Sequence, residues 1–473
     1  MITLALIFLP LAGLIAAWCA GARQKILLTV LNITALLHCT GTLLLWIFPD
    51  LSMLPGSAGE LIGMDELSLF VLSVVSLLFL LASLQTVKYF PMVRKRFEEN
   101  AEKFLSPQLV VICLLGFLSS MTLVTAARNF GLLWVAMEAT TLGSAPLIIF
   151  RRTGSSLEAM WKYILICSVG IGFALFGTML LAIAGAGSHA GMDMLMLAEA
   201  KLDPEWFKAA FVLILAGYGT KMGLAPFQSW MPDAYSEAPG VLSVLSSGAL
   251  LACSFLGIVR VWEVAPAEVL PFCKQMLLAV GIISLALAAF FIVRQSDYKR
   301  MLAYSSMEHM GLVAIFWSMD LHMAAIIHIA AHALLKVALF MTADNIQFAY
   351  DTQKISAVSG VLGQLRRNGT VYILSVLALC GMPPSPLFFT EMNLVFAGGP
   401  VLGGVILLLL FVVFAGMTYH VLSMTMGKVS AVAVQESEIR TLERLSTIPM
   451  LVLVLVLTAG SLLLVGLAVL ECI

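Results

Sequence analysis

The chain has 473 residues, of which 61% are hydrophobic and 11% are charged, and its formal net charge is −1. A soluble domain has about 25% charged residues, so this composition excludes an ordinary soluble protein and indicates an integral membrane protein. The sequence has no basic patch interleaved with aromatic residues, which argues against nucleic-acid binding.

Apolar segments follow one another along nearly the whole chain. A transmembrane helix needs about 20 mainly apolar residues, and only helices satisfy their own backbone in lipid. The first segment lacks a basic start and a cleavage site, so it is typical of a retained span rather than a signal peptide. We therefore expect an all-α polytopic membrane protein. Its sequence predicts about fourteen spans: 3–21, 26–48, 66–90, 107–126, 130–149, 158–184, 206–233, 239–262, 270–293, 301–317, 321–346, 369–397, 400–426 and 446–471.

Loop charges predict the orientation of these spans. If both termini lie on the outer face, 19 Lys and Arg residues fall in loops on the opposite face and 5 in loops on the outer face. Lys221 and Lys336 lie inside spans. This asymmetry obeys the positive-inside rule and favours both termini outside.

Two spans, the seventh and the twelfth, are interrupted by proline. Proline inside a helix removes a hydrogen bond, and paired broken helices are typical of inverted repeats with a site at their interface. We therefore expect two inverted five-helix repeats, formed by helices 4–8 and helices 9–13. The prolines are Pro226, Pro232, Pro239, Pro383, Pro384 and Pro386. The expected domains are 1–106 with three helices, 107–262 and 263–426 with one repeat each, and 427–473 with the last helix.

Three ionisable residues lie near the middle of apolar spans: Glu138, Lys221 and Lys336. A charge at the bilayer centre costs roughly 3 kcal/mol, so such residues usually mark an ion or proton path. Lys221 precedes the first proline break, and a buried lysine whose anionic partner comes and goes can take up and release a proton. Glu138 is the expected partner. The alternative is a lysine that extends to the membrane surface, with an isolated polar contact.

A row of titratable residues is expected on the eleventh span. His328, His332 and Lys336 are spaced four residues apart, which places them on one helical face. Histidine can receive a proton on one nitrogen and release it from the other, so the row could relay protons. His309, in the tenth span, follows the polar run Ser305, Ser306 and Glu308. The alternative to a proton relay is that these side chains form interhelical hydrogen bonds. Zinc binding by His328 and His332 is also compatible with their spacing, but no third ligand is evident.

Glu391 follows the second proline break and suits a proton-release site. The alternative interpretation is that Glu391 is a carboxylate at the membrane interface, in contact with water. Asp344, Asp233 and Glu237 lie closer to span ends, so solvated or capping roles are expected for them.

Cysteine spacing predicts no redox centre or metal site in this chain. Iron–sulfur clusters and zinc sites need clustered thiolates, and no CxxC pair occurs. We therefore expect no cofactor here. The eight cysteines are Cys19, Cys39, Cys113, Cys167, Cys253, Cys273, Cys380 and Cys472.

The segment KMGLAPFQSWMPDAYSEAP at 221–239 combines a lysine, a proline break, W-x-P-D-A and an AP pair. This segment resembles the seventh-helix signature of the antiporter-like, proton-translocating subunits of complex I, Mrp antiporters and membrane-bound hydrogenases. MDELSLFVL at 64–72 and WVAMEATTL at 134–142 also match that family. DYKRMLAYSSMEHMGLVAIF at 297–316 and GMPPSPLFFTE at 381–391 most resemble the hydrogenase-4 component F branch.

This resemblance implies a fourteen-helix fold and proton translocation driven by redox chemistry elsewhere in a complex. It implies membrane and soluble redox subunits as partners, no catalytic centre in this chain, and a bacterial or archaeal plasma membrane. By position, Glu138 and Lys221 match the charged pair of the family. His309, His332 and Lys336 match its polar axis, and Glu391 matches its terminal charged group.

One departure concerns the eighth helix, where family members in complex I commonly have a lysine. Here Ala252 stands at that position. Two alternatives to a proton-translocating hydrogenase-like subunit stay open, and Ala252 bears on the second of them. The chain could belong to a cation/proton antiporter, or it could be a non-conducting scaffold for soluble subunits.

Overall fold

A computed structural model describes residues 2–52, 59, 61–99, 103–188, 190–429 and 435–471, with side chains of the last segment described as far as 463. Cys472 lies outside the described residues. Within these ranges the chain is helical, and its extended pairings are isolated bridges rather than strands. The described residues form two compact units, Met1–Val87 with Arg96–Met276, and Lys88–Lys95 with Leu277–Ile473.

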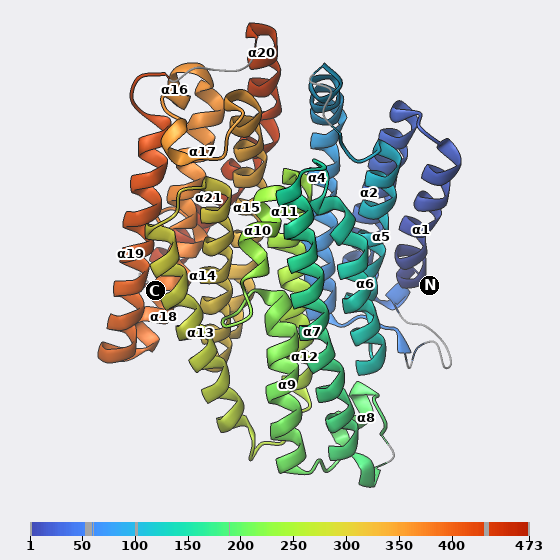
Figure 1. Cartoon of the computed structure of the whole chain (residues 1–473). Coiled ribbons are helices and arrows are strands. Elements are labelled where there is room, and N and C mark those ends of the chain that lie inside the picture. Colours follow the sequence, from blue (N-terminus) through green and yellow to red (C-terminus); the bar gives the residue numbers. More distant parts are fainter. Residues whose placement is uncertain are drawn as a thin grey trace. The chain divides into compact units, whose positions relative to one another are not determined.

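Unit 1 contains the N-terminal helices (Figure 1). They are α1 (Ile2–Ala20), α2 (Gln24–Ile47), most of α4 (Glu66–Glu99), α5 (Pro107–Ala126), α6 (Phe130–Ile148), α7 (Gly154–Ala184), α8 (Met194–Glu199), α9 (Pro204–Met222), α10 (Trp230–Glu237), α11 (Gly240–Val244), the π-helical turn η3 (Leu245–Leu250) and α12 (Leu251–Glu263).

Unit 2 contains the C-terminal helices (Figure 1). They are most of α13 (Leu270–Val293), α14 (Tyr298–Ser318), α15 (His322–Tyr350), α16 (Val361–Gln364), α17 (Arg366–Leu379), α18 (Pro386–Ala397), α19 (Gly399–Thr425), α20 (Glu436–Leu445) and α21 (Thr447–Glu471).

Eleven helices in the described part of the chain are long and apolar enough to cross a membrane, which confirms a polytopic membrane protein. The other three expected spans are helical at the predicted places. Two of them, α9 and α14, have charged side chains, and the third is divided between α17 and α18. The count of about fourteen therefore stays a prediction.

Both expected helix breaks are present. The first separates α9 from α10 and begins at Gly223, whose φ is +77°. The second separates α17 from α18 and begins at Gly381, whose φ is +68°. Glycine adopts this left-handed conformation without steric cost, so it can end each helix where proline then prevents continuation. Whether the two breaks belong to inverted repeats stays a prediction.

Close helix packing holds the first break in place. A side chain at Gly217 of α9 would meet the backbone of Ala174 and Gly170 on α7 at 2.6 Å. Small residues of this kind let two membrane helices approach closely. Across the break, the Trp230 indole donates a hydrogen bond of 2.9 Å to the carbonyl of Thr220. The end of α9 is therefore fixed against its neighbours.

Candidate functional site

Lys221 lies in the last turn of α9 and is completely buried within unit 1. Its ammonium donates hydrogen bonds to three groups of α6: the Met137 carbonyl at 3.2 Å, Thr140 Oγ1 at 2.8 Å and Thr141 Oγ1 at 2.6 Å. An ammonium has three protons to donate. The site therefore satisfies a charged lysine with neutral acceptors.

Glu138 connects to the same network through a hydroxyl. Thr141 donates to Glu138 Oε2 at 3.3 Å, and Ser168 of α7 donates to Glu138 Oε1 at 2.9 Å. The carboxylate is half-buried. The structure thus places Thr141 between the expected partners Lys221 and Glu138, which form no direct ion pair in the part of the chain that the structure describes.

Lys336 has a similar environment within unit 2. Its side chain is completely buried on α15, and its ammonium donates to the Leu302 carbonyl at 2.7 Å and to Ser305 Oγ at 2.6 Å, both on α14. Glu308, also on α14 and buried, interacts electrostatically with Lys336. In each unit, then, a buried lysine donates to a backbone carbonyl and at least one hydroxyl on an adjacent helix.

Two histidines and a threonine of unit 2 form a hydrogen-bonded row. His309 Nδ1 lies 2.9 Å from His328 Nε2, and His328 Nδ1 lies 2.8 Å from Thr390 Oγ1. Because Thr390 gives its own proton to the Leu387 carbonyl at 2.9 Å, His328 must donate from Nδ1 to Thr390. His328 Nε2 then accepts from His309 Nδ1. Neutral rings in this row therefore have defined tautomers.

His332 and Glu391 lie beside this row. The rings of His332 and His309 have centroids 5.0 Å apart, and His332 Nε2 has no hydrogen-bond partner among the described residues. Glu391 on α18 is 5% exposed, and its Oε1 likewise has no partner there. The interfacial, solvated alternative for Glu391 is therefore wrong. The structure brings together all five predicted site residues of unit 2, and it places Thr390 and Glu308 beside them. The five are His309, His328, His332, Lys336 and Glu391.

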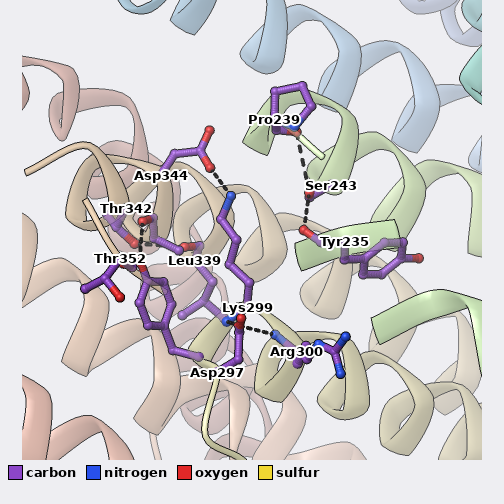
Figure 2. Close-up of polar contacts among 12 residues, drawn as sticks. Tyr235, Pro239, Ser243, Asp297, Lys299, Arg300, Leu339, Thr342, Asp344 and Thr352 are labelled. Atoms are coloured by element: carbon purple, nitrogen blue, oxygen red, sulfur yellow. Dashed lines mark hydrogen bonds and ion pairs between the residues drawn. The ribbon is translucent and has the colours of Figure 1, made fainter. Parts of the chain in front are cut away.

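Asp344 is a further correction, because it is neither solvated nor a helix cap. Its Oδ1 lies 2.6 Å from the Nζ of Lys299 (Figure 2). Both side chains are buried. Asp297 instead caps α14 by accepting from the backbone amides of Lys299 and Arg300 (Figure 2). Lys299 precedes the expected tenth span, 301–317, so its burial was not predicted.

Sequence reasoning also missed a buried histidine in unit 1. His38 of α2 lies between Ser76 of α4 and Thr122 of α5, with both ring nitrogens 2.9 Å from a hydroxyl oxygen. The ring therefore connects three helices. No charged residue and no other histidine lies near His38 in the sequence, so no pattern indicated its role.

The eighth expected span has no lysine at its centre, in accord with the sequence. Ala252 is completely buried in α12, directly after the π-helical turn η3. Buried hydroxyls line this span in place of a cation, from Ser243, Ser246, Ser247 and Ser254. Figure 2 shows Ser243 donating to the carbonyls of Tyr235 and Pro239, which fixes the connection between α10 and α11.

Asp65 directly precedes α4, outside the apolar spans, and forms an ion pair with Arg260 in the last turn of α12. Asp65 accepts from Arg260 at 2.6 Å and from the Ser68 amide at 2.8 Å. Burial alone would raise the pKa of Asp65, but the hydrogen bond and positive charge of Arg260 outweigh it and lower this pKa to about 2. The carboxylate is therefore charged under all ordinary conditions.

Comparison with known proteins places these features in a family. Residues 127–418 match the family described as "NADH:quinone oxidoreductase/Mrp antiporter, TM". The chain belongs to this family. The matched region includes every predicted site residue, from Glu138 to Glu391.

Individual relatives match different shares of this chain. A hydrogenase-4 component F homolog of Methylacidiphilum infernorum is 36% identical over 302 residues, which are 61% of this chain and 63% of that protein. The F(420)H(2) dehydrogenase subunit N of Methanosarcina mazei is 28% identical over 346 residues, 70% of this chain and 68% of that protein. The chain thus spans less than two thirds of the first relative's length.

A solved structure shows the same fold over nearly the whole chain. A chain of the membrane-bound sulfane sulfur reductase, an archaeal respiratory membrane complex, superposes with a TM-score of 0.80 at 19% identity. The match covers 97% of this chain and 94% of that chain. The helical architecture expected from the sequence is therefore also the fold of that chain.

Proposed function

We propose that this chain is a proton-translocating membrane subunit of a redox-driven complex of the hydrogenase-4 type. Its family membership and its similarity to the hydrogenase-4 component F homolog support this proposal. The electron-transfer chemistry is then performed by partner subunits, both membrane-embedded and soluble, and this chain needs no cofactor of its own. The complex lies in a prokaryotic plasma membrane, with both termini of this chain on the outer face.

The observation that supports proton transfer best is the link from Lys221 through Thr141 to Glu138. The Thr141 hydroxyl accepts from the ammonium at 2.6 Å and donates to the carboxylate at 3.3 Å. A hydroxyl with one donor and one acceptor can pass a proton along by exchanging both bonds. Lys221 can therefore lose a proton toward Glu138 without either side chain leaving its place.

Unit 2 offers a second buried relay with different groups. Lys336 lies on the same helical face as His328 and His332, and the hydrogen bond between His328 and His309 extends the row to α14. Glu391, next to the second helix break, is the terminal acid of this unit. We infer that protons move between Lys336 and Glu391 by way of these histidines.

A substitution at Lys221 tests the proposal. In vesicles that contain the whole complex, Lys221→Ala should lower proton uptake coupled to electron transfer at least 10-fold, while the complex stays assembled. Lys208→Ala is the matched control, since Lys208 lies on the same helix in an exposed ion pair with Glu205. Proton uptake that Lys221→Ala leaves unchanged would refute the role of Lys221.

A cation/proton antiporter is the second candidate, because the family description includes Mrp antiporters. Sodium prefers hard oxygen ligands, as other hard cations do, whereas the row in unit 2 is built largely of nitrogen atoms. Sodium-dependent transport by this chain without electron transfer would favour the antiporter. Proton uptake that persists in the assembled wild-type complex would exclude a purely structural scaffold.

A further inference from the structure

Three metal-binding side chains lie together inside unit 2. His309, His328 and Glu391 come from α14, α15 and α18, are all buried, and each offers a ligand atom within 4.8 Å of the others. We propose that these three residues bind a divalent transition-metal ion such as Zn²⁺. The sequence spacing indicated His328 and His332 as the pair, whereas the fold supplies His309 and the missing carboxylate.

The carboxylate of Glu391 is oriented as a ligand would require. Its Oε1 has no hydrogen-bond partner in the described protein, and a buried oxygen in that state is costly. A side chain at Gly381 would collide with Oε2 of Glu391. Because glycine has no side chain, the carboxylate of Glu391 can occupy this space. A bound cation would satisfy the unpartnered oxygen.

The hydrogen bonds of His328 prepare one nitrogen for a metal. Donation from Nδ1 to Thr390 leaves the lone pair on Nε2, and metal-binding histidines usually donate their second N–H in this way. His309 Nδ1 now lies 2.9 Å from that lone pair. Two nitrogen ligands of tetrahedral zinc lie about 3.4 Å apart, so the rings need to separate by about 0.5 Å, with His309 changing its tautomer.

The donor set selects the class of ion. Two imidazoles with one carboxylate are a known ligand set of zinc, with a fourth position left open, whereas calcium and magnesium need oxygen ligands. The charged groups around the site are Glu308, which interacts electrostatically with Glu391, and Lys336, which interacts with His309 and His332. The two carboxylates together offset the lysine and favour a divalent cation.

Metal binding would stop proton transfer in unit 2, because the ion would occupy the lone pair that links His328 to His309. This consequence rests on the proposed function, whereas metal binding itself does not. Zinc should therefore inhibit the complex as a reversible blocker.

Direct zinc binding tests the site. The purified complex with His328→Gln or Glu391→Gln should bind one zinc fewer per copy of this chain than the wild-type complex at equilibrium. Alternatively, its affinity for zinc at that site should be at least 100-fold weaker. His322→Gln is the control, because His322 begins the same helix and stacks on Trp317 outside the three ligands. Equal stoichiometry and affinity in wild type and both ligand variants would overturn the proposal.

Spectroscopy on the wild-type complex does not depend on whether variants fold. Zinc added to the wild-type complex should show two imidazoles and a carboxylate by X-ray absorption, and Co²⁺ added in its place should show a tetrahedral spectrum. A purely octahedral cobalt spectrum would contradict the site. Zinc that binds at these residues without inhibiting proton uptake would refute only the block, and Lys221→Ala tests the proposed function independently.

Discussion

The ammonium of Lys299 lies 2.6 Å from the carboxylate of Asp344, and the two side chains are 1% and 6% exposed. They join the start of α14 to the C-terminal part of α15, the two helices that hold the histidine row. Two charges taken out of water stabilise one another only as a pair. This ion pair therefore fixes the two helices in register.

Removing one member of this pair should destabilise the protein strongly. Asp344→Leu leaves the Lys299 ammonium buried without its partner carboxylate, and such changes cost about 3–5 kcal/mol. Thermal unfolding of the purified protein in detergent measures the loss. The double variant Lys299→Met with Asp344→Leu should recover much of it, and a double variant as unstable as the sum of the two single variants would contradict the interpretation.

Thr141 should matter for proton transfer beyond its contact with Lys221. Thr141→Val removes the hydroxyl between Lys221 and Glu138, so coupled proton uptake should fall about 10-fold or more, an increase in barrier of about 1.4 kcal/mol. Thr140→Val is the matched control, since Thr140 also accepts from Lys221 but has no hydrogen bond to Glu138. Thr141→Ser should restore uptake. Equal losses in both valine variants would show that the hydroxyls merely solvate the ammonium.

Gly381 should be required for the position of Glu391. Gly381→Ala adds a side chain that collides with the Glu391 carboxylate, in addition to the cost of about 1–2 kcal/mol for a left-handed backbone. Proton uptake and thermal stability should both decrease. Gly399→Ala provides the comparison, because its φ is +65° and a side chain there would meet nothing within 4 Å. Proton uptake should decrease only in Gly381→Ala, and similar uptake in both variants would contradict the role of the carboxylate.

The pair Asp65–Arg260 should make stability depend on acid pH. The pKa of Asp65 is lowered to about 2 from its usual 3.8, so the folded state favours the charged carboxylate. The stabilisation is complete above about pH 4 and is lost as the pH falls toward 2. Unfolding measured between pH 5 and pH 2 should show this loss in the wild type and less of it in Asp65→Asn. Identical pH profiles would contradict the role of the pair.

The sequence predicted the positions of the helices and of both breaks, because apolar length and proline act locally. It also predicted the burial of Lys221 and Lys336, which stand far from the ends of the expected spans, but not that of Lys299 and Asp344. It did not predict the hydroxyl partners of these lysines and of His328, which are Thr141, Ser305 and Thr390. Threonine and serine occur throughout membrane helices and usually donate to their own backbone, so only the packing of neighbouring helices shows which hydroxyls meet a lysine or a histidine.

Asp344 and Glu391 show a second limit of sequence reasoning. Distance from a span end gave the wrong environment for Asp344, because burial depends on the helices packed around a residue. For Glu391 the sequence favoured a functional acid, but it could not bring His309 and His328 to the same carboxylate. Contacts between residues 60 or more positions apart have no local signature.

The complete burial of Lys221, near the middle of a broken span, has a consequence for energy conversion. Moving one elementary charge across the whole membrane changes its free energy by about 2.3 kcal/mol for each 100 mV of transmembrane voltage. Moving a proton only halfway changes its free energy by about half of that. Occupancy of the lysine should then respond to voltage as well as to proton concentration. The transmembrane voltage would therefore oppose or assist protonation of Lys221 before any proton has left the protein.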